Sequence, residues 1–252
     1  MVQPIMKLKY LYQILGAIFF LIFSACNRPE KDWNVEGVKA LNSKNYDRAY
    51  AAFKHAVASD QSANAHFNLS ICYEQGYGVP KDLQVAREHL IYAHQKGLVM
   101  ATYNLAVYQE NGWGGERNLD GALSLYGQAA KKGDVESMYH LGYLYSQSQA
   151  PLQNTSLAIH WYSLASGKGH VEAMFNLGLL HDKEDDSQIR TAAEWYLMAA
   201  NQGHPRAQYN LALIILRGDL NVERFGTARK LLQLAAEQNF EEARIALEAL
   251  KK

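Results

Sequence analysis

The chain has 252 residues, and 25 basic side chains are balanced by 25 acidic ones, so it is formally neutral at pH 7. A nucleic-acid-binding surface usually requires a basic excess, which this composition does not supply. The length is ample for a buried core.

Residues 1–25 are predicted to be a targeting signal outside the fold, in which two lysines precede an apolar stretch over residues 11–23. That stretch is short for a membrane span, which needs about 20 apolar residues. It leads into Ile-Phe-Ser-Ala-Cys at residues 22–26, which resembles a bacterial lipobox, although that pattern prefers Leu where Phe23 stands. The resemblance implies cleavage before Cys26 and lipidation of its sulfur and new amino group. An ordinary signal peptide and an uncleaved anchor remain open.

Cysteine usage agrees with a lipidated N-terminus. If Cys26 carries lipid, Cys72 is the one remaining cysteine and cannot form an internal disulfide. Its apolar position predicts a small buried side chain. Asn27 differs from the aspartate that signals inner-membrane retention in well-studied bacteria, which favours the outer membrane. Residues 26–35, with Pro29 and mixed charges, are predicted to be a tether.

Residues 36–64 are predicted to form a degenerate first repeat. Within residues 44–60, small, bulky and small side chains stand at Ala49, Phe53 and Ala56, and the stretch resembles the back half of a tetratricopeptide repeat. Terminal units of a repeat array are atypical because one of their faces meets water. This unit is therefore expected to cap the N-terminal end of the array.

From residue 65 onward a small residue returns at intervals of 36, 36, 36, 34 and 36 residues. These positions are Ala65, Ala101, Ser137, Ala173, Ala207 and Ala243. A leucine stands four residues after each of them. The back half of each unit has an alanine, a bulky residue four positions later and a small residue seven positions later, as at Ala158, Tyr162 and Ala165. Side chains at i, i+4 and i+7 share one helical face, so each unit is expected to be two closely packed helices.

Residues suited to left-handed helix caps mark the predicted helix ends. The first helix of a unit is expected to end at Gly76, Gly112 or Gly218. The second helix is expected to end at Gly97, Gly133, Gly169 or Gly203, with Asn239 in the last unit. Asparagine is the usual non-glycine residue in that conformation, so the substitution supports the register.

Three stretches carry the motif of a known family: YEQGYGVPKD at residues 73–82, AIHWYSLASGKG at 158–169 and AAEWYLMAANQG at 192–203. They resemble the Sel-one-like repeat, a relative of the tetratricopeptide repeat, and so regular a period is typical of a solenoid. The resemblance implies an all-α fold, a right-handed α/α solenoid of helix-turn-helix repeats that binds other proteins. The predicted repeats span residues 65–100, 101–136, 137–172, 173–206 and 207–242, and a capping helix spans 243–252.

On a helical wheel, two positions of the first helix point away from the paired helix. The third position of each unit is aromatic: Phe67, Tyr103, Tyr139, Phe175 and Tyr209. The fourth position is an amide or a histidine: Asn68, Asn104, His140, Asn176 and Asn210. The tetratricopeptide resemblance implies that the asparagine position lies on the concave face and hydrogen-bonds a peptide, with Tyr143 widening the apolar floor. The alternative is that the rings pack one repeat on the next and the amides satisfy neighbouring backbone groups.

Catalysis is not expected, although some relatives in this family are described as β-lactamase-like, and a hydrolase is the weaker alternative. The chain contains no Ser-x-x-Lys, Gly-x-Ser-x-Gly or His-Glu-x-x-His motif and no phosphate-binding loop. No cofactor, metal ion or small-molecule substrate is predicted.

These expectations combine into a non-catalytic scaffold that is anchored in the bacterial envelope and binds a protein or peptide partner on its concave face. The lipobox resemblance implies an outer-membrane lipoprotein, which is expected to face the periplasm and to assist the assembly of an envelope complex. The alternative is a surface-exposed or secreted protein that engages host proteins.

Overall fold

The computed structural model describes residues 32–60, 62–147, 153–184, 188–218 and 227–250. These residues form thirteen helices and no strand, so the predicted all-α class is confirmed. The predicted signal segment and the lipidation candidate Cys26 lie outside the described residues.

Successive helices pack as hairpins, one hairpin to each repeat. The N-terminal hairpin comprises α2 (Trp33–Asn42) and α3 (Tyr46–Asp60). The five hairpins that follow are α4 (Ala63–Gln75) with α5 (Leu83–Gln95), α6 (Val99–Asn111) with α7 (Leu119–Lys131), α8 (Val135–Ser146) with α9 (Thr155–Ser166), α10 (Val171–Glu184) with α11 (Ile189–Asn201), and α12 (Pro205–Arg217) with α14 (Ala228–Glu237). A single helix, α15 (Glu241–Ala249), closes the array.

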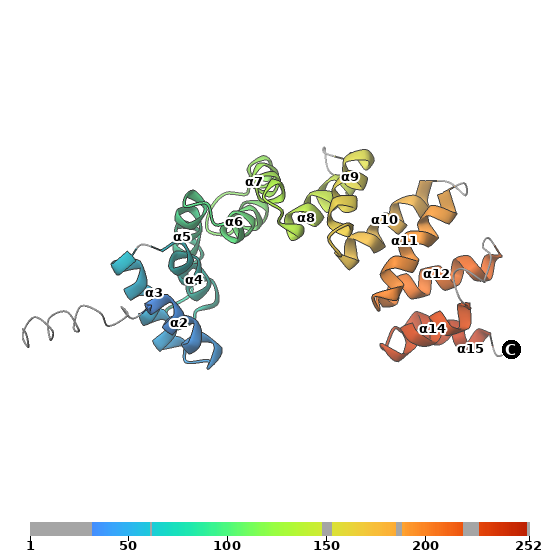
Figure 1. Ribbon diagram of the computed structural model, residues 1–252, viewed down its shortest axis with the longest axis horizontal. Coiled ribbons are helices and arrows are strands. Elements are labelled where there is room, and N and C mark those ends of the chain that lie inside the picture. Colours follow the sequence, from blue (N-terminus) through green and yellow to red (C-terminus); the bar gives the residue numbers. More distant parts are fainter. Residues whose placement is uncertain (1–31, 61, 148–152, 185–187, 219–226, 251–252) are drawn as a thin grey trace, which may run out of the picture.

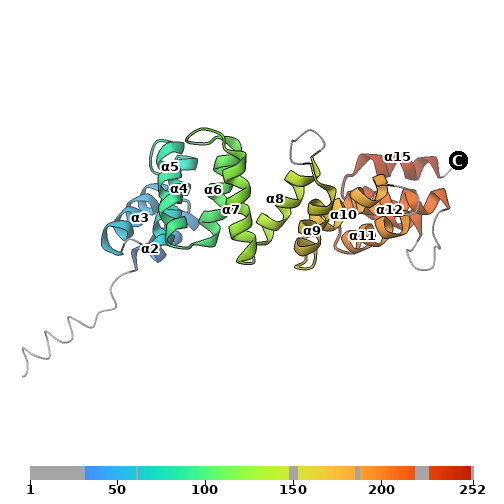
Figure 2. The same ribbon diagram turned by 90° about the horizontal axis from the view of Figure 1, so that it is seen from above.

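The hairpins follow one another along a curved path and do not fold back into a globule. Figure 1 shows an arch, with α2 and α3 at one end and α14 and α15 at the other. Figure 2 shows the same helices from above, in a row along the long axis. Among the described helices, every extensive contact joins neighbours in one hairpin or in adjacent hairpins. The hydrophobic core is therefore spread along the chain, which confirms the predicted solenoid.

The predicted cap residues end the helices because their backbones adopt the left-handed conformation there. Gly76, Gly112 and Gly218 end α4, α6 and α12 with φ angles of 77°, 72° and 86°. The four glycines that follow the second helices also have positive φ angles, and Asn239 takes their place at 64°. The predicted ends of these helices are confirmed.

The small residues that recur at the head of each repeat all have 0% exposure and let the two helices of a hairpin approach closely. The bulky residue of the second helix is buried against them, as at Tyr162 and Tyr196. These two rings also press on glycines of the first helix. A Cβ on Gly142 would lie 2.6 Å from the Tyr162 ring, and one on Gly178 would lie 2.5 Å from the Tyr196 ring. This approach, one residue after the repeated leucine, is a feature that the sequence pattern did not predict.

The loop inside each of the first two repeats packs on the preceding hairpin. A Gly-x-Gly sequence brings Gly78 and Gly114, both at positive φ, against the start of the preceding second helix. A Cβ on Gly78 would lie 2.5 Å from the carbonyl oxygen of Tyr46. A Cβ on Gly114 would overlap the carbonyl oxygen of Leu83. These glycines therefore join one repeat to the next through direct backbone contact.

The helices begin earlier than the predicted boundaries. Helix α2 starts at Trp33, so the end of the predicted tether is helical. The first helix of each repeat starts two residues before the small residue that opens the predicted unit, and α15 starts at Glu241 instead of at residue 243. The reason is that the small residue marks the buried contact between two helices, which lies inside the first turn and not at its first residue.

Candidate functional site

The aromatic residues at the third position of each repeat pack between repeats. Tyr139 stacks on His170 at 4.5 Å between ring centroids, and Phe175 stacks on His204 at the same distance. Tyr209 meets the ring of Phe240 at 5.4 Å. The second ring of each pair lies just before the next repeat's first helix, so the pair bridges two hairpins.

The exposure of these rings bears on the predicted binding surface. Phe67, Tyr103, Tyr139 and Tyr209 are partly buried, and Phe67, Tyr103 and Tyr139 line the central core cluster. Phe175 departs from the prediction, because it is 1% exposed and its ring is enclosed by neighbouring side chains. Packing between repeats is thus the main visible role of the aromatic position.

The polar residues at the fourth position are engaged within the chain. The Asn68 amide donates to Asn34 Oδ1 at 2.9 Å, and the Asn104 amide donates to the Met100 carbonyl of its own helix at 2.8 Å. His140 Nε2 lies 3.1 Å from the Tyr103 hydroxyl.

The last two amides of the series contact tyrosines. Burial raises the pKa of Tyr162 and Tyr196, and the nearby amides of Asn176 and Asn210 respectively oppose that rise in pKa. The Asn176 amide has the same effect on Tyr139, whose pKa burial raises. These polar side chains are therefore partly buried and partnered, and Asn176 contributes to an open surface described next.

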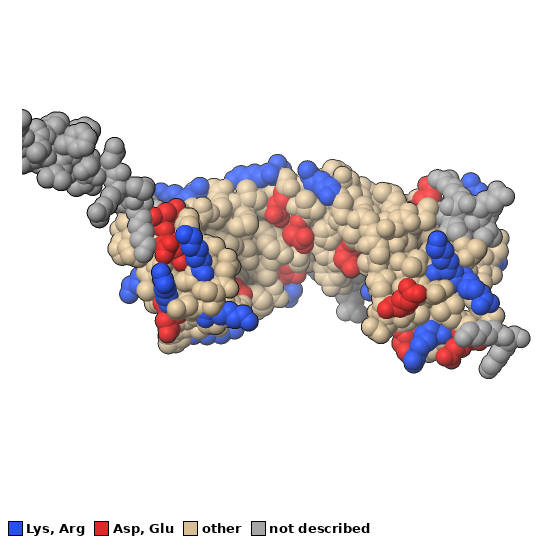
Figure 3. Space-filling view, turned by 60° about the horizontal axis from the view of Figure 1, so that its bottom comes forward, with Lys and Arg blue, Asp and Glu red and all other residues tan. Residues whose placement is uncertain are grey.

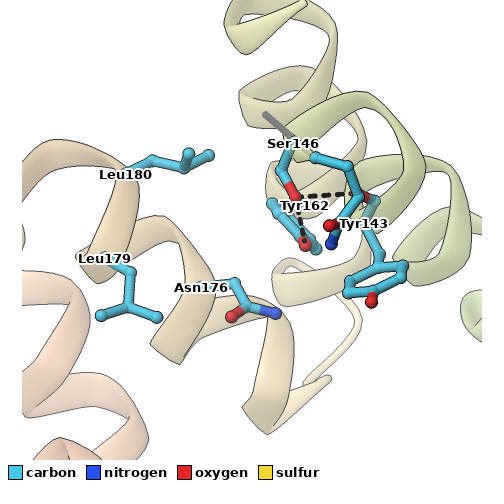
Figure 4. Close-up of a pocket in the computed structure, with 7 residues that line it drawn as sticks. Tyr143, Ser146, Tyr162, Asn176, Leu179 and Leu180 are labelled. Carbon is cyan, nitrogen blue, oxygen red and sulfur yellow. Dashed lines mark hydrogen bonds between the residues drawn. The ribbon is translucent and has the colours of Figure 1, made fainter. Parts of the chain in front are cut away.

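One cavity opens between α8, α9 and α10, at the centre of the chain (Figure 4). Its volume is about 240 Å³, and we call it the α8–α10 notch. It is lined by Tyr143, Ser146, Gln147, Tyr162, Asn176, Leu179 and Leu180. Two of the predicted site residues meet there: Tyr143, which is 43% exposed, and Asn176 on the facing helix.

The notch exists because of the residue at position 146. In the second repeat the Tyr126 hydroxyl donates to the Glu110 carboxylate at 2.7 Å, and in the fourth the Tyr196 hydroxyl donates to Asp182 at 3.2 Å. The third repeat has Ser146 at this position. Its short side chain donates to the Tyr143 carbonyl at 2.8 Å and lies 3.4 Å from the Tyr162 hydroxyl, which leaves space above that ring. The exchange of a carboxylate for a serine was the sequence signal that could have located the notch.

Two carboxylates lie on the same helices as the notch residues, closer to the helix N-termini. Glu136 and Glu172 lie in the first turns of α8 and α10, with their side chains 57% and 53% exposed. Figure 3 shows that the recessed middle of this face carries acidic side chains. Burial, followed by the charges of Glu136, Asp134 and Glu110, raises the pKa of Tyr103 to about 12.

The described charged side chains on four of the first helices are all acidic; Lys183 of α10 is not among the described side chains. The charged side chains described on α4, α6, α8 and α10 are Glu74, Glu110, Glu136, Glu172 and Asp182. Among the described side chains of these four helices there is no lysine or arginine. A formally neutral chain thus concentrates acidic side chains on the described parts of α4, α6, α8 and α10.

Histidines lie beside two of these carboxylates. His170 Nδ1 accepts a hydrogen bond from the Ala173 backbone N–H at 3.2 Å, so this nitrogen carries no proton. The proton is on Nε2, which lies 3.5 Å from Glu136. His204 and Glu172 repeat the arrangement at 3.0 Å. In both pairs the histidine Nε2 faces the carboxylate, and the histidine Nδ1 accepts a hydrogen bond from the first turn of the following helix.

Other kinds of site find no support in the part of the chain that the structure describes. It contains no cluster of three or more His, Cys, Asp or Glu side chains arranged to hold a metal ion. None of its helices combines the length and the apolar character that crossing a membrane requires. Cys72 is free and buried, and burial raises the pKa of its thiol to about 11, which suppresses nucleophilic reactivity.

Comparison with known proteins agrees with the repeats seen in the structure. A family model described as the Sel1 repeat matches residues 63–98, 99–134, 135–170, 171–204 and 205–240. These boundaries coincide with the observed starts of the first helices. No curated protein matches the chain.

Two solved structures share the fold. A Sel1 repeat protein from Oxalobacter formigenes matches with a TM-score of 0.71 and 23% identity, over 88% of this chain and 89% of that chain. A protein from uropathogenic Escherichia coli strains, described as a protective antigen with an SLR fold, matches with a TM-score of 0.72 and 25% identity. That match covers 85% of this chain and 47% of the other, so this chain spans about half the length of that antigen.

Proposed function

We propose, since this chain belongs to the Sel1 repeat family, that it is an envelope-anchored scaffold that holds a protein partner at the α8–α10 notch. Sel1 repeat proteins are generally non-catalytic scaffolds for protein interactions. The observation that carries the proposal is the notch itself, with the half-exposed Tyr143 ring on one side and the Asn176 amide on the other. Exposed aromatic side chains beside a pocket are typical anchors of protein interfaces.

The size of the notch favours a protein partner over a metabolite. At about 240 Å³ it is smaller than the roughly 300 to 1,000 Å³ typical of small-molecule sites. It has room for one large side chain of a partner. Its polar groups, the Asn176 amide and the Tyr162 hydroxyl, are placed to fix the orientation of that side chain or of the backbone next to it.

Tyr143→Ala is expected to reduce partner capture about tenfold, because removing a central aromatic anchor typically costs more than about 1 kcal/mol of binding. The measurement is quantitative recovery of crosslinked partners from solubilised membranes, with the wild-type chain as reference. The melting temperature should change little, since the Tyr143 ring is 43% exposed.

Leu164→Ala is the matched control for this experiment. Leu164 lies on α9, is 41% exposed and does not line the notch. Its loss removes a similar exposed apolar surface and should leave partner recovery unchanged. If Leu164→Ala loses the partners while Tyr143→Ala keeps them, the binding surface lies on the other side of the solenoid and the proposal is wrong.

The envelope location rests on the N-terminal sequence. The lipobox-like residues 22–26 support a lipid on Cys26 and an outer-membrane lipoprotein that faces the periplasm and assists the assembly of an envelope complex. A second candidate is exposure at the cell surface, which is favoured by the description of the Escherichia coli relative as a protective antigen. Protease treatment of intact cells separates the two: digestion supports surface exposure, and protection supports the periplasm.

Cys26→Ser is expected to move the protein from the membrane pellet to the soluble fraction, because the thioether that holds the lipid cannot form. The measurement is fractionation by ultracentrifugation together with the intact mass, which should lose the mass of the attached lipid. Cys72→Ala serves as the control, since that cysteine is buried in the repeats and should not affect pelleting. Unchanged pelleting and mass in Cys26→Ser would refute lipidation.

A further inference from the structure

We infer that the α8–α10 notch selects a cationic segment, in which a large apolar side chain enters the notch and a lysine or arginine nearby pairs with Glu172 and Glu136. The inference rests on the proposed function and narrows the partner from any protein to a class of peptide chemistry. It is carried by the position of two exposed carboxylates on the same helical faces as the notch residues.

The carboxylates share helical faces with the notch residues. On α8, Glu136, His140 and Tyr143 are spaced i, i+4 and i+7, and on α10 Glu172 precedes Asn176 by one turn. A helix rises about 1.5 Å per residue, so Glu172 lies about 6 Å along α10 from Asn176, and Glu136 lies about 10 Å along α8 from Tyr143. An extended peptide rises about 3.3 Å per residue. A cationic residue two positions from the anchored side chain therefore comes level with Glu172, and one three positions away comes level with Glu136.

The groups that the structure places directly beside these carboxylates are histidines. His170 Nε2 lies 3.5 Å from Glu136 and His204 Nε2 lies 3.0 Å from Glu172, while the Nδ1 atom of each ring accepts a backbone N–H. The first basic residue on the next first helix is Arg206, whose guanidinium lies over the Phe175 ring at 4.8 Å. Arg206 therefore packs against α10 through an aromatic ring, and no ion pair joins it to Glu172 among the described contacts.

The same arrangement disfavours acidic partners. An acidic residue beside the anchor would face two exposed carboxylates, so like-charge repulsion excludes it, whereas a lysine or arginine gains pairing and faster association. Tyr143 adds to this preference, because an exposed tyrosine ring is a surface on which a guanidinium can stack.

The test is selection of random heptapeptides on the detergent-solubilised full chain, followed by affinity measurement with fluorescently labelled copies of the enriched peptides. The expected peptides carry a net positive charge and place a lysine or arginine within three residues of a large apolar residue. Their dissociation constant should rise about tenfold in the double variant E136Q with E172Q, since each exposed pair contributes a few-fold. It should also rise with salt concentration.

The double variant E88Q with E116Q is the charge-matched control, because both carboxylates are exposed and lie outside the notch. It should bind the peptides like the wild type. Selected peptides that are neutral or acidic, or that bind the E136Q/E172Q variant as tightly as the wild type, would overturn the inference of a cationic partner. The notch would still stand as a binding site. Selected peptides that bind Tyr143→Ala as well as the wild type, or no selected peptides at all, would overturn the proposed function together with the inference.

Discussion

Gly114→Ala is expected to destabilise the protein by about 2 to 5 kcal/mol, through backbone strain and overpacking together. Its φ angle of 65° is a left-handed conformation, which costs a non-glycine residue about 1 to 2 kcal/mol. The new Cβ would also overlap the Leu83 carbonyl oxygen and lie 3.0 Å from the Gln84 Cα. Both obstacles are backbone atoms at the start of a helix, so they cannot yield as a flexible side chain would. Overpacking of this kind costs about 1 to 3 kcal/mol in addition.

Gly97→Ala isolates the two contributions. Gly97 has a φ angle of 86°, but no atom would lie within 4 Å of its Cβ. This variant should therefore lose only the conformational share, about 1 to 2 kcal/mol. Urea denaturation of both variants, followed by circular dichroism, measures the difference. Equal losses would mean that the loop at Gly114 does not press on the preceding hairpin.

Tyr126→Phe is expected to cost about 1.5 to 3 kcal/mol, because it removes a hydrogen bond from a buried tyrosine to a partly buried carboxylate. The Tyr126 hydroxyl donates to Glu110 Oε2 at 2.7 Å, and the ring is fully buried. Burial and then this hydrogen bond raise the pKa of Tyr126 well above its usual range. The phenylalanine leaves the Glu110 carboxylate without its donor, so the cost includes the lost solvation of that charge.

Tyr162→Phe is the matched comparison at the same position of the next repeat. Its hydroxyl lies 3.4 Å from Ser146 Oγ and bonds to no carboxylate, so no carboxylate loses a partner. The expected loss is about 1 kcal/mol. Thermal melts of the two variants decide the matter: if Tyr162→Phe is the more damaging change, the carboxylate at position 110 is not the stabilising group.

The features of the fold that could be predicted are those that physical chemistry ties to a residue type. A buried helix crossing requires a small side chain, and a left-handed cap requires glycine or asparagine, so the repeat period and the helix ends were readable, including Asn239. The starts of the first helices were less readable, since the residues before them include Leu98, Asp134 and His204, which share no chemical type.

The candidate site was less predictable than the fold. The position of Tyr143 and Asn176 on first helices could be assigned from the helical period, but the cavity between them depends on a missing carboxylate at Ser146. A repeat pattern is recognised from the residues that recur, so a carboxylate that is absent from one repeat does not draw attention. The exposure of Phe175 was misjudged for a related reason: its enclosure depends on His204, which belongs to the following repeat.

Among the described helices, each hairpin packs extensively only on its neighbours. The arch therefore bends elastically by small rotations at the joints between hairpins. The rotations at successive joints add up. The distance between the two ends of the arch therefore depends on all the joints together and on no single contact. A force that separates the two ends of the arch would be distributed over the aromatic ring pairs between successive repeats. A rigid partner bound at the middle of the arch would restrict the joints on both sides of it. The distance between the two ends of the arch would then be fixed.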